Sequence, residues 1–236
     1  MPKEKQRILL KFSGELFSSD ENAIDMDKVF TIAEEINLIK KDRHIGVVFG
    51  GGNIFRGRGS TKKGINLNVN GAHYTGMVAT IVNALALKTA FDALNIPSRV
   101  ISSFQIPEVL GSSTKLDIEK FLKSDEILIF AAGTGNPFVS TDTAAVIRAL
   151  EMKAEIVLKG TSVPGIFDSN PKENENAKLL KKMTHDEFFQ IPGAYILDRT
   201  AVMIALENKL PIYVFKWGPG QLKRAVRQKA SGTLIQ

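Results

Sequence analysis

Short apolar runs alternate with helically spaced segments along the chain, and this alternation is the feature that most constrains its fold. Apolar runs predict strands at 8–12, 45–49, 99–102, 127–131, 155–159 and 211–215. Helical spacing predicts one helix through 29–39, after a capping Asp25, and a long one over 76–94. Further helices are expected around 144–149, near His185 and near Asp198. Strands and helices in this order are typical of an α/β sandwich with a largely parallel sheet.

The composition excludes several classes of protein. Hydrophobic residues make up 44% of the 236 residues and charged residues 24%, as in ordinary globular proteins and unlike disordered or fibrous chains. The chain has no cysteine, which excludes disulfides and a thiolate nucleophile and favours a cytoplasmic location. The longest stretch without charge, 64–87, holds several Asn and a His and therefore predicts no membrane span.

Charge is distributed unevenly along the chain. The net charge is +6, and the excess lies after Glu207, where six cations and no acid occur. Because cations suit the C-terminal end of a helix and a solvated face, we interpret this tail in that way rather than as a nucleic-acid surface. Between Arg43 and Phe91 no Asp or Glu occurs, so an anionic ligand is expected there. The cations of this region that cluster beside glycines are Arg56, Arg58, Lys62 and Lys63.

Three glycine-containing loops follow predicted strands. The first loop is Lys11–Gly14, the second is Gly50–Arg56 and the third is Gly133–Thr141. Glycine lets backbone N–H groups approach an anion closely, and the positive end of a following helix adds to the attraction. Neither the P-loop pattern nor a complete GxGxxG pattern occurs. Since ligands of parallel α/β sheets bind beyond the carboxyl ends of the strands, the three loops together predict a site for several phosphates.

The motifs in and around these loops resemble those of the bacterial uridylate (UMP) kinases of the amino-acid kinase superfamily. The resemblance covers nearly the whole chain. The motifs that carry it are Lys11-Phe-Ser-Gly-Glu15, Gly50-Gly-Gly-Asn-Ile-Phe-Arg-Gly57, Gly76-Met-Val-Ala-Thr80 with Asn83, Gly133-Thr-Gly-Asn-Pro-Phe138, Thr141-Asp142, and Val157-Leu-Lys-Gly-Thr161. The motif Gly133–Phe138 followed by Thr141-Asp142 is highly specific for this family. The motif Lys11–Glu15 indicates only the superfamily.

The resemblance implies a three-layer α/β/α sandwich with a largely parallel central sheet, as a single domain over 1–236. Its acceptor-binding part would cover roughly 1–150 and its ATP-binding part roughly 151–236. The implied reaction transfers the γ-phosphoryl group of ATP to UMP, with Mg²⁺ as cofactor, and yields UDP and ADP. A homohexamer and a response to GTP or UTP as effectors are also implied. Neither a nucleic acid nor a membrane is expected as a partner.

Carried over position by position, the resemblance implies two sets of binding residues. ATP is expected to contact Lys11, Phe12, Ser13, Gly14, Gly52, Arg56, Thr161, Phe167 and Asn170. UMP is expected to contact Gly51, His73, Thr134, Gly135, Asn136, Pro137, Phe138, Val139, Ser140 and Thr141. Three positions depart from the family pattern, which has Asp where this chain has His73, Pro164 and Asn170. His73 can donate a hydrogen bond to a ribose hydroxyl, or it is a partly exposed loop residue, and we favour the loop slightly.

Phosphoryl transfer depends on positioning and on neutralised charge. The acceptor phosphate, with a second pKa of about 6, is mostly an oxyanion near neutral pH and needs no general base. We expect Lys11 at the γ-phosphoryl group, Arg56 at the donor phosphates and Lys159 as a further charge near the transferred group. Asp142 would orient the lysines or a metal-bound water, and the alternative is an ordinary acid in the first turn of a helix, where the helix dipole favours it. Asp198 is a weaker candidate that an ordinary helix start explains equally well, and side chains alone predict no metal site.

Two other functions stay open at this point. One keeps the fold but changes the acceptor to a carboxylate or a carbamate, as in other members of the superfamily. The other is a nucleotide-binding regulator without turnover, which the three departures and the basic tail would suit. The third loop argues against the first alternative. The charges at Lys11, Arg56, Asp142 and Lys159 argue against the second, because binding alone needs no charge on the line of transfer.

Overall fold

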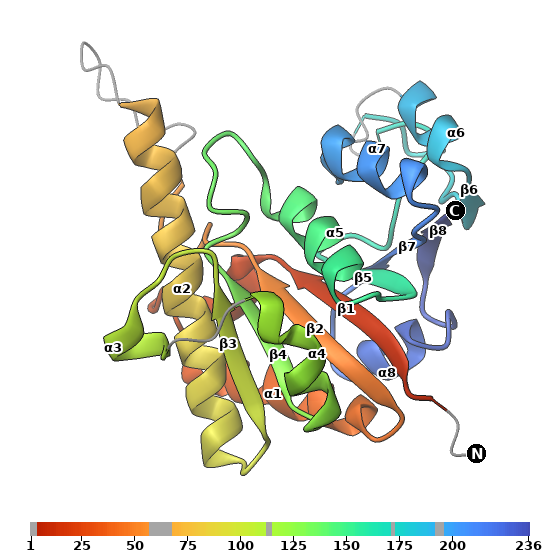
Figure 1. Cartoon of the computed structure of the whole chain (residues 1–236). Coiled ribbons are helices and arrows are strands. Elements are labelled where there is room, and N and C mark those ends of the chain that lie inside the picture. Colours follow the sequence, from red (N-terminus) through yellow and green to blue (C-terminus); the bar gives the residue numbers. More distant parts are fainter. Residues whose placement is uncertain (1–3, 57–67, 112–114, 171–172, 192–195) are drawn as a thin grey trace.

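A central sheet organises the molecule. The computed structural model describes residues 4–56, 68–111, 115–170, 173–191 and 196–236. Its strands are β1 (Gln6–Phe12), β2 (Arg43–Phe49), β3 (Ser98–Ser102), β4 (Ile127–Ala131), β5 (Ile156–Thr161), β6 (Lys182–Met183), β7 (Ile212–Lys216) and β8 (Gly232–Ile235). They lie in the order β3-β4-β2-β1-β5-β7-β8-β6 (Figure 1). Neighbouring strands run parallel except β7 and β8, which are antiparallel.

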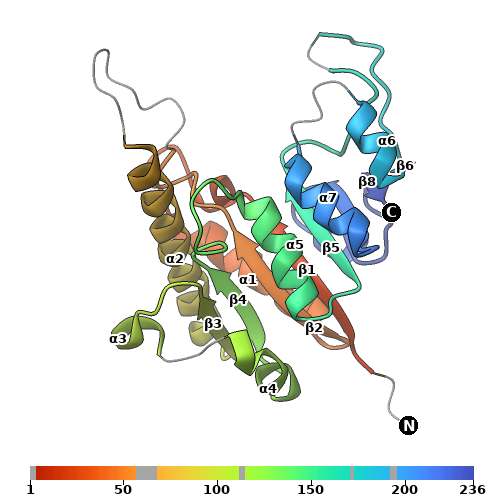
Figure 2. The ribbon, with the colours of Figure 1, turned by 45° about the horizontal axis from the view of Figure 1, so that its top comes forward.

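Helices cover both faces of this sheet. They are α1 (Met26–Lys40), α2 (Val69–Ala93), α3 (Pro107–Leu110), α4 (Ile118–Lys123), α5 (Thr141–Glu151), α6 (His185–Gln190), α7 (Arg199–Glu207) and α8 (Gln221–Ala225). Residues of α1, α2 and α8 pack on one face, and residues of α4, α5, α6 and α7 pack on the other. Figure 2 shows α5 and α7 in front of the sheet and α1 and α2 behind it. The predicted three-layer sandwich is confirmed.

The alternation of side chains along β1 explains the two cores. Ile8 and Leu10 belong to the cluster under α1 and α2, whereas Leu9 belongs to the cluster under α5. Successive side chains of a strand point to opposite faces, so a strand buried on both sides reads as a continuous apolar run. This is why the predicted strands were visible as runs rather than as alternating patterns.

The long helix begins earlier than the sequence suggested. The predicted helix began at residue 76, whereas α2 begins at Val69. Asn68 caps it, because its side-chain oxygen accepts a hydrogen bond from the Gly71 N–H at 3.2 Å. Glycines and asparagines in this stretch lower helix propensity, but the cap and the packing of the following turns stabilise it. The short helices α3 and α4 were not predicted.

The parallel strands bring the glycine loops together. Because β1, β2, β4 and β5 run in the same direction, the loops that follow β1, β2 and β4 lie at one edge of the sheet (Figure 1). The sheet runs continuously through both halves of the chain, and the division into an acceptor part and an ATP part near residue 150 stays a prediction. Within the described ranges, no helix is both long and apolar enough to cross a membrane.

Candidate active site

Two buried lysines lie side by side at the centre of this edge. Lys11 of β1 and Lys159 of β5 are paired in register on neighbouring strands. Both point to the face that α5 covers, as do Leu9 and Val157 two residues before them. Lys11 is 5% exposed and Lys159 is 8% exposed. Two ammonium groups this deeply buried require a counter-charge, because an unpaired buried charge is strongly unfavourable.

Asp142 supplies that counter-charge. It lies in the first turn of α5, which Ser140 caps by accepting hydrogen bonds from the N–H groups of Asp142 and Thr143. One carboxylate oxygen of Asp142 is 3.0 Å from the Lys11 ammonium, and the other is 2.5 Å from the Lys159 ammonium. A first-turn acid is favoured by the helix dipole, so this residue occupies an ordinary helix position and orients both lysines as well.

Burial and charge act in opposite directions on these groups. Burial alone would raise the pKa of the Asp142 carboxyl, but the charges of Lys11 and Lys159 outweigh it and hold that pKa well below its usual range. Burial lowers the pKa of Lys159 to about 8, against the attraction of Asp142 and with the repulsion of Lys11. The cluster therefore holds a permanently ionised carboxylate and a lysine that loses its proton slightly above neutral pH.

Asp198 connects α7 to the start of α5. It caps α7 by accepting from the Thr200 N–H at 3.1 Å, as its predicted helix-start role requires. Its other carboxylate oxygen accepts from the Ser140 hydroxyl at 2.7 Å and from the Thr143 hydroxyl. The Asp198 N–H in turn donates to Asp142 at 3.3 Å. Asp198 thus stabilises the position of Asp142, both by a hydrogen bond from its own backbone N–H and by its contacts with the residues that begin α5.

The first and second loops pack tightly against each other. A Cβ atom on Gly14 would lie 2.2 Å from the Asn53 side-chain oxygen and 2.4 Å from the Gly50 carbonyl oxygen, so only glycine fits there. Asn53 and Asn83 exchange amide hydrogen bonds of 2.8 and 3.0 Å, and Asn83 also donates to the Gly50 carbonyl at 2.7 Å. Asn83 lies on α2 and is fully buried. One polar side chain of α2 therefore fixes the second loop.

The charge of Arg56 is paired with that of a carboxylate. Its guanidinium forms an ion pair with Glu15, and its Nε donates to the Gly52 carbonyl at 3.2 Å. The other predicted cations of this region, at positions 58, 62 and 63, lie outside the described residues. An open hollow of 350 Å³ beside Arg56 is also lined by Glu15, Asp20 and Glu21. Carboxylates from residues 15–21 thus lie beside Arg56, although the sequence around Arg56 contains no acid.

The third loop adopts an unusual backbone conformation. Gly133 and Gly135 have φ values of 54° and 84°, and the non-glycine residues Ala132 and Phe138 have φ values of 59° and 67°. Positive φ at a residue with a side chain costs free energy and persists only where neighbouring groups enforce it. Phe138 is 69% exposed at the end of the loop, before α5 begins at Thr141.

His73 lies in α2, so the interpretation as a loop residue is wrong. The helix begins at Val69, and His73 is in its first turns. Its ring lies 4.7 Å from the ring of Phe138, at a tilt of 57°. The early start of α2 places this imidazole beside the third loop. The hydrogen bond to a ribose hydroxyl stays a prediction.

The residues expected to bind ATP lie in several kinds of environment. Phe12 is fully buried and packs against Phe49 and Trp217, at 5.4 and 4.9 Å between ring centroids. Its ring is therefore not available to a ligand, and its carbonyl accepts from the Gly50 N–H at 3.0 Å. Thr161 ends β5, and its hydroxyl donates to the Val163 carbonyl at 2.7 Å.

The remaining two expected ATP ligands follow β5. Phe167 is half-buried and forms a β-bridge with Leu179. Asn170 is exposed, and its side-chain amide donates to Glu173 at 2.7 Å. Both residues therefore belong to a turn of the chain that lies outside the strands of the sheet.

Comparison with known proteins gives this site its context. The model of the amino acid kinase family matches residues 6–216. The chain belongs to the amino acid kinase family. It is 39% identical to the uridylate kinase of Legionella pneumophila (strain Corby), over 99% of this chain and 96% of that protein. It is 40% identical to the chloroplastic uridylate kinase of Arabidopsis thaliana, over 99% of this chain and 69% of that protein.

A solved structure supports the same conclusion. The crystal structure of UMP kinase from Ureaplasma parvum superposes with a TM-score of 0.92 and 34% identity, over 99% of this chain and 100% of that chain. The predicted membership of the superfamily is therefore confirmed. As a member of this family, the chain is an ATP-dependent phosphotransferase.

Sequence reasoning missed four polar residues that hold the loops of this kinase. Asn83 fixes the second loop, and Thr80, Ser103 and Arg148 contact the third loop or the residue before it. Thr80 and Asn83 belong to motifs that carried the resemblance, but they received no role. A polar residue within an otherwise apolar helix face is the signal that could have found Thr80, Asn83 and Arg148, since such a residue needs a buried partner.

The carboxylates of the site are engaged by donor groups of the protein among the described residues. Within the part of the chain that the structure describes, no group of three His, Cys, Asp or Glu residues could hold a metal ion. The oxygens of Asp142 accept from Lys11 and Lys159, and the oxygens of Asp198 accept from the α7 backbone and two hydroxyls. Neither carboxylate fits as a direct ligand of Mg²⁺ in this arrangement.

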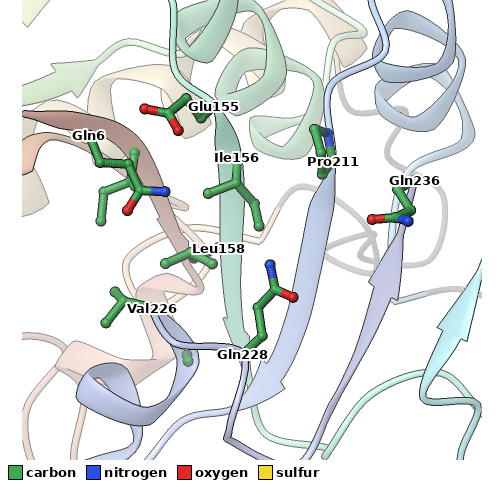
Figure 3. Close-up of a pocket in the computed structure, with 10 residues that line it drawn as sticks. Gln6, Glu155, Ile156, Leu158, Pro211, Val226, Gln228 and Gln236 are labelled. Carbon is green, nitrogen blue, oxygen red and sulfur yellow. The ribbon is translucent and has the colours of Figure 1, made fainter. Parts of the chain in front are cut away.

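A second cavity lies at the opposite end of the strands. It has a volume of 230 Å³ and is lined by Ile156 and Leu158 of β5 and by Gln6, Gln228 and Gln236, among others (Figure 3). Gln6 and Ile156 are the first residues of β1 and β5, whereas the lysines lie near the ends of these strands. This cavity is therefore separate from the charged cluster.

Proposed function

We propose that this kinase transfers the γ-phosphoryl group of ATP to UMP and releases UDP and ADP. The observation that carries the proposal is the buried cluster of Lys11, Asp142 and Lys159, which lies where the first loop and the start of α5 meet. Phosphoryl transfer needs fixed positive charge along the line between donor and acceptor. UMP is proposed as the acceptor because the chain is similar to uridylate kinases. The third loop, which is expected to bind UMP, lies directly before α5.

Each charged residue has a proposed role. Lys11 stabilises the γ-phosphoryl group during transfer, and Lys159 adds charge on the same side. Asp142 keeps both ammonium groups in place, because each of its oxygens contacts one lysine. Arg56 contacts the donor phosphates, for which it must exchange or share its ion pair with Glu15. Asp198 is a positioning residue in this proposal, since its contacts are with α5 and α7.

The binding residues complete the proposal. On the donor side these are Lys11, Phe12, Ser13, Gly14, Gly52, Arg56, Thr161, Phe167 and Asn170. On the acceptor side they are Gly51, His73 and residues 134–141, where the contact between His73 and Phe138 supports a joint role for α2 and the third loop. The oxyanion of UMP attacks without a general base, as its second pKa of about 6 allows.

Mg²⁺ would be bound to ATP rather than to carboxylates of this chain in this proposal. A divalent cation bound to the ATP phosphates neutralises part of their charge during transfer. The oxygens of Asp142 and Asp198 are already used within the protein, so we infer that phosphate oxygens hold the metal. The lysines of this chain then provide the remaining positive charge.

We also propose a homohexamer and a cytoplasmic location, in which the enzyme serves pyrimidine nucleotide biosynthesis. Tyr74, Val78 and Val82 are exposed at four-residue intervals on α2, which is a pattern that suits a helix packed against another subunit. The absence of cysteine suits a reducing compartment. A response to GTP or UTP stays a prediction.

A coupled assay of ADP release tests the acceptor. It compares UMP, CMP, glutamate and carbamate at equal concentrations, with ATP and Mg²⁺ present. We expect UMP to support the fastest release. Faster release with glutamate or carbamate would favour the alternative acceptors, and no release with any of the four would favour a regulator without turnover.

A further inference from the structure

Arg148 is a fully buried cation that the proposed reaction does not use. It lies in the last turn of α5 and is 2% exposed. Its Nη2 donates to the Gly133 carbonyl at 2.9 Å and to the Ser103 hydroxyl at 2.7 Å, and its Nη1 donates to Glu151 at 2.5 Å. A guanidinium in the core is unfavourable unless its donors find acceptors. The Gly133 carbonyl in the third loop is one of the acceptors that make its burial possible.

Side chains from three elements hold the start of the third loop and the residue before it. Ser103, which follows β3, donates its hydroxyl hydrogen to the same Gly133 carbonyl at 2.9 Å. One residue earlier, the Ala132 N–H donates to the Thr80 hydroxyl of α2 at 2.8 Å. Ala132 and Gly133 are the two consecutive residues with positive φ. These contacts enforce a backbone conformation that an alanine would not otherwise adopt.

We propose that Arg148 is a positioning residue that aims the third loop at the phosphate of the acceptor. The Gly133–Thr134 peptide is trans, so its C=O and N–H point in opposite directions. Arg148 holds the carbonyl, and the Thr134 N–H therefore points to the other side of the loop. A backbone N–H fixed in direction before the ligand arrives is an effective donor to an oxyanion. This inference rests on the proposed function, in which the third loop binds UMP.

Burial of Arg148 distinguishes this role from direct contact with substrate. Because its side chain is enclosed by α5, Ser103 and Gly133, it acts on the acceptor only through the loop. The hydrogen bonds of Arg148 are with Gly133, Ser103 and Glu151, and these three residues are not among those expected to bind ATP. Loss of Arg148 should therefore weaken the binding of UMP and leave the binding of ATP nearly unchanged. General damage to the fold would weaken the binding of both substrates.

The experiment compares Arg148→Met and Arg148→Lys with the wild-type chain. We measure the KM for UMP, the KM for ATP and, by calorimetry, the Kd for UMP. In Arg148→Met we expect the KM and Kd for UMP to rise about tenfold or more, and the KM for ATP to stay within about twofold. Arg148→Lys should recover part of the loss, because an ammonium can still donate to the Gly133 carbonyl but lacks the planar fork.

Two further variants keep the test decisive. Arg7→Met is the matched control, since Arg7 is another ion-paired arginine with Glu119 as partner, at the start of β1. It should lower the melting temperature without changing the Kd for UMP. If Arg148→Met does not fold, Ser103→Ala removes one hydrogen bond from Arg148 and one to Gly133, and should raise the Kd for UMP about threefold.

Two results would overturn the inference. They are an unchanged Kd for UMP in the folded variants, and an equal rise of the constants for UMP and ATP. Because the Kd for UMP does not depend on turnover, it separates this inference from the proposed function. A wild-type chain that binds UMP but does not phosphorylate it would contradict the proposed function alone.

Discussion

In the proposed function the third loop serves the acceptor and the turn that follows β5 serves the donor, and these two segments are held in different ways. Side chains from three other elements hold the start of the third loop, since Ser103 and Arg148 contact Gly133 and Thr80 contacts Ala132, the residue before the loop. The turn after β5, of which residues 167–170 and 173–178 are described, is held largely by its own contacts. The Asp168 carboxylate accepts from the Lys178 N–H at 2.9 Å, and the Asn170 side chain donates to Glu173 at 2.7 Å.

This difference has a consequence for how each side can respond to a ligand. The start of the third loop is bonded to α2, α5 and the residue after β3, so a shift of Gly133 would break these hydrogen bonds or require those elements to move with it. A turn bonded within itself can shift as a unit, because its hydrogen bonds travel with it. Thr233 of β8 fixes only the base of this segment, by contacts with Ile166 and Leu180. We therefore expect the acceptor side to be preformed and the donor side to adjust when ATP binds.

The largest expected effect is at Lys11, which is proposed to act between donor and acceptor. Lys11→Met removes a charge from the line of transfer and should lower kcat about 10²–10³-fold, which corresponds to about 2.7–4 kcal/mol of transition-state stabilisation. Steady-state kinetics with ATP and UMP measure this loss. Lys41→Met, at an exposed lysine after α1, is the matched control. A kcat within a few-fold of wild type would contradict the role of Lys11 and the idea that both regions meet there.

The next effect is a loss of activity at alkaline pH. Lys159 has a pKa of about 8, so its ammonium becomes neutral as the pH rises through that value. We expect kcat to fall about tenfold per pH unit well above pH 8. Lys159→Arg should have a flat profile over this range, since the guanidinium keeps its charge. A wild-type profile that stays flat to pH 10 would contradict a role for this charge in the transfer.

The contribution of Lys159 to the free energy of unfolding should increase over the same pH range in which kcat falls. The pKa of Lys159 is lower in the folded chain than the ordinary value of 10.5, so the unfolded chain binds more protons between the two values. The contribution of Lys159 to the free energy of unfolding therefore increases as the pH rises from about 8 to 10.5. Denaturant titrations of the wild type and Lys159→Arg at pH 7.5 and 9.5 measure this contribution. If the free energy of unfolding fell more between pH 7.5 and 9.5 in the wild type than in Lys159→Arg, the lowered pKa of the buried Lys159 would be contradicted.

The smallest effect tests the donor side. Asp168→Ala removes the acceptor of the Lys178 N–H and loosens the turn after β5. We expect the KM for ATP to rise about 2- to 10-fold while the KM for UMP stays unchanged, which is the reverse of the pattern expected for Arg148. Asp42→Ala, at another exposed acid, serves as the control. If the KM for UMP rises as much as that for ATP, the two sides are not independent.

Local patterns predicted most of the fold because they depend on residues close in sequence. Strands such as β1 and β4 and the capped helix α1 follow from apolar runs and from Asp25. The start of α2 did not follow, because Gly71 and the asparagines before it lower helix propensity. That error also produced the wrong interpretation of His73. The antiparallel pairing of β7 and β8 has no local signal, since pairing depends on the whole sheet.

The sequence by itself determined which side chains carry charge beside the glycine loops, because Lys11, Asp142 and Lys159 each follow from a local motif. Only the tertiary structure decided that the two lysines share one register with Asp142 between them. It also decided that Arg56 meets Glu15 and that Arg148 holds Gly133. The physical reason is that these contacts join separate elements, and the folding of the sheet, rather than spacing along the chain, brings them within hydrogen-bond distance.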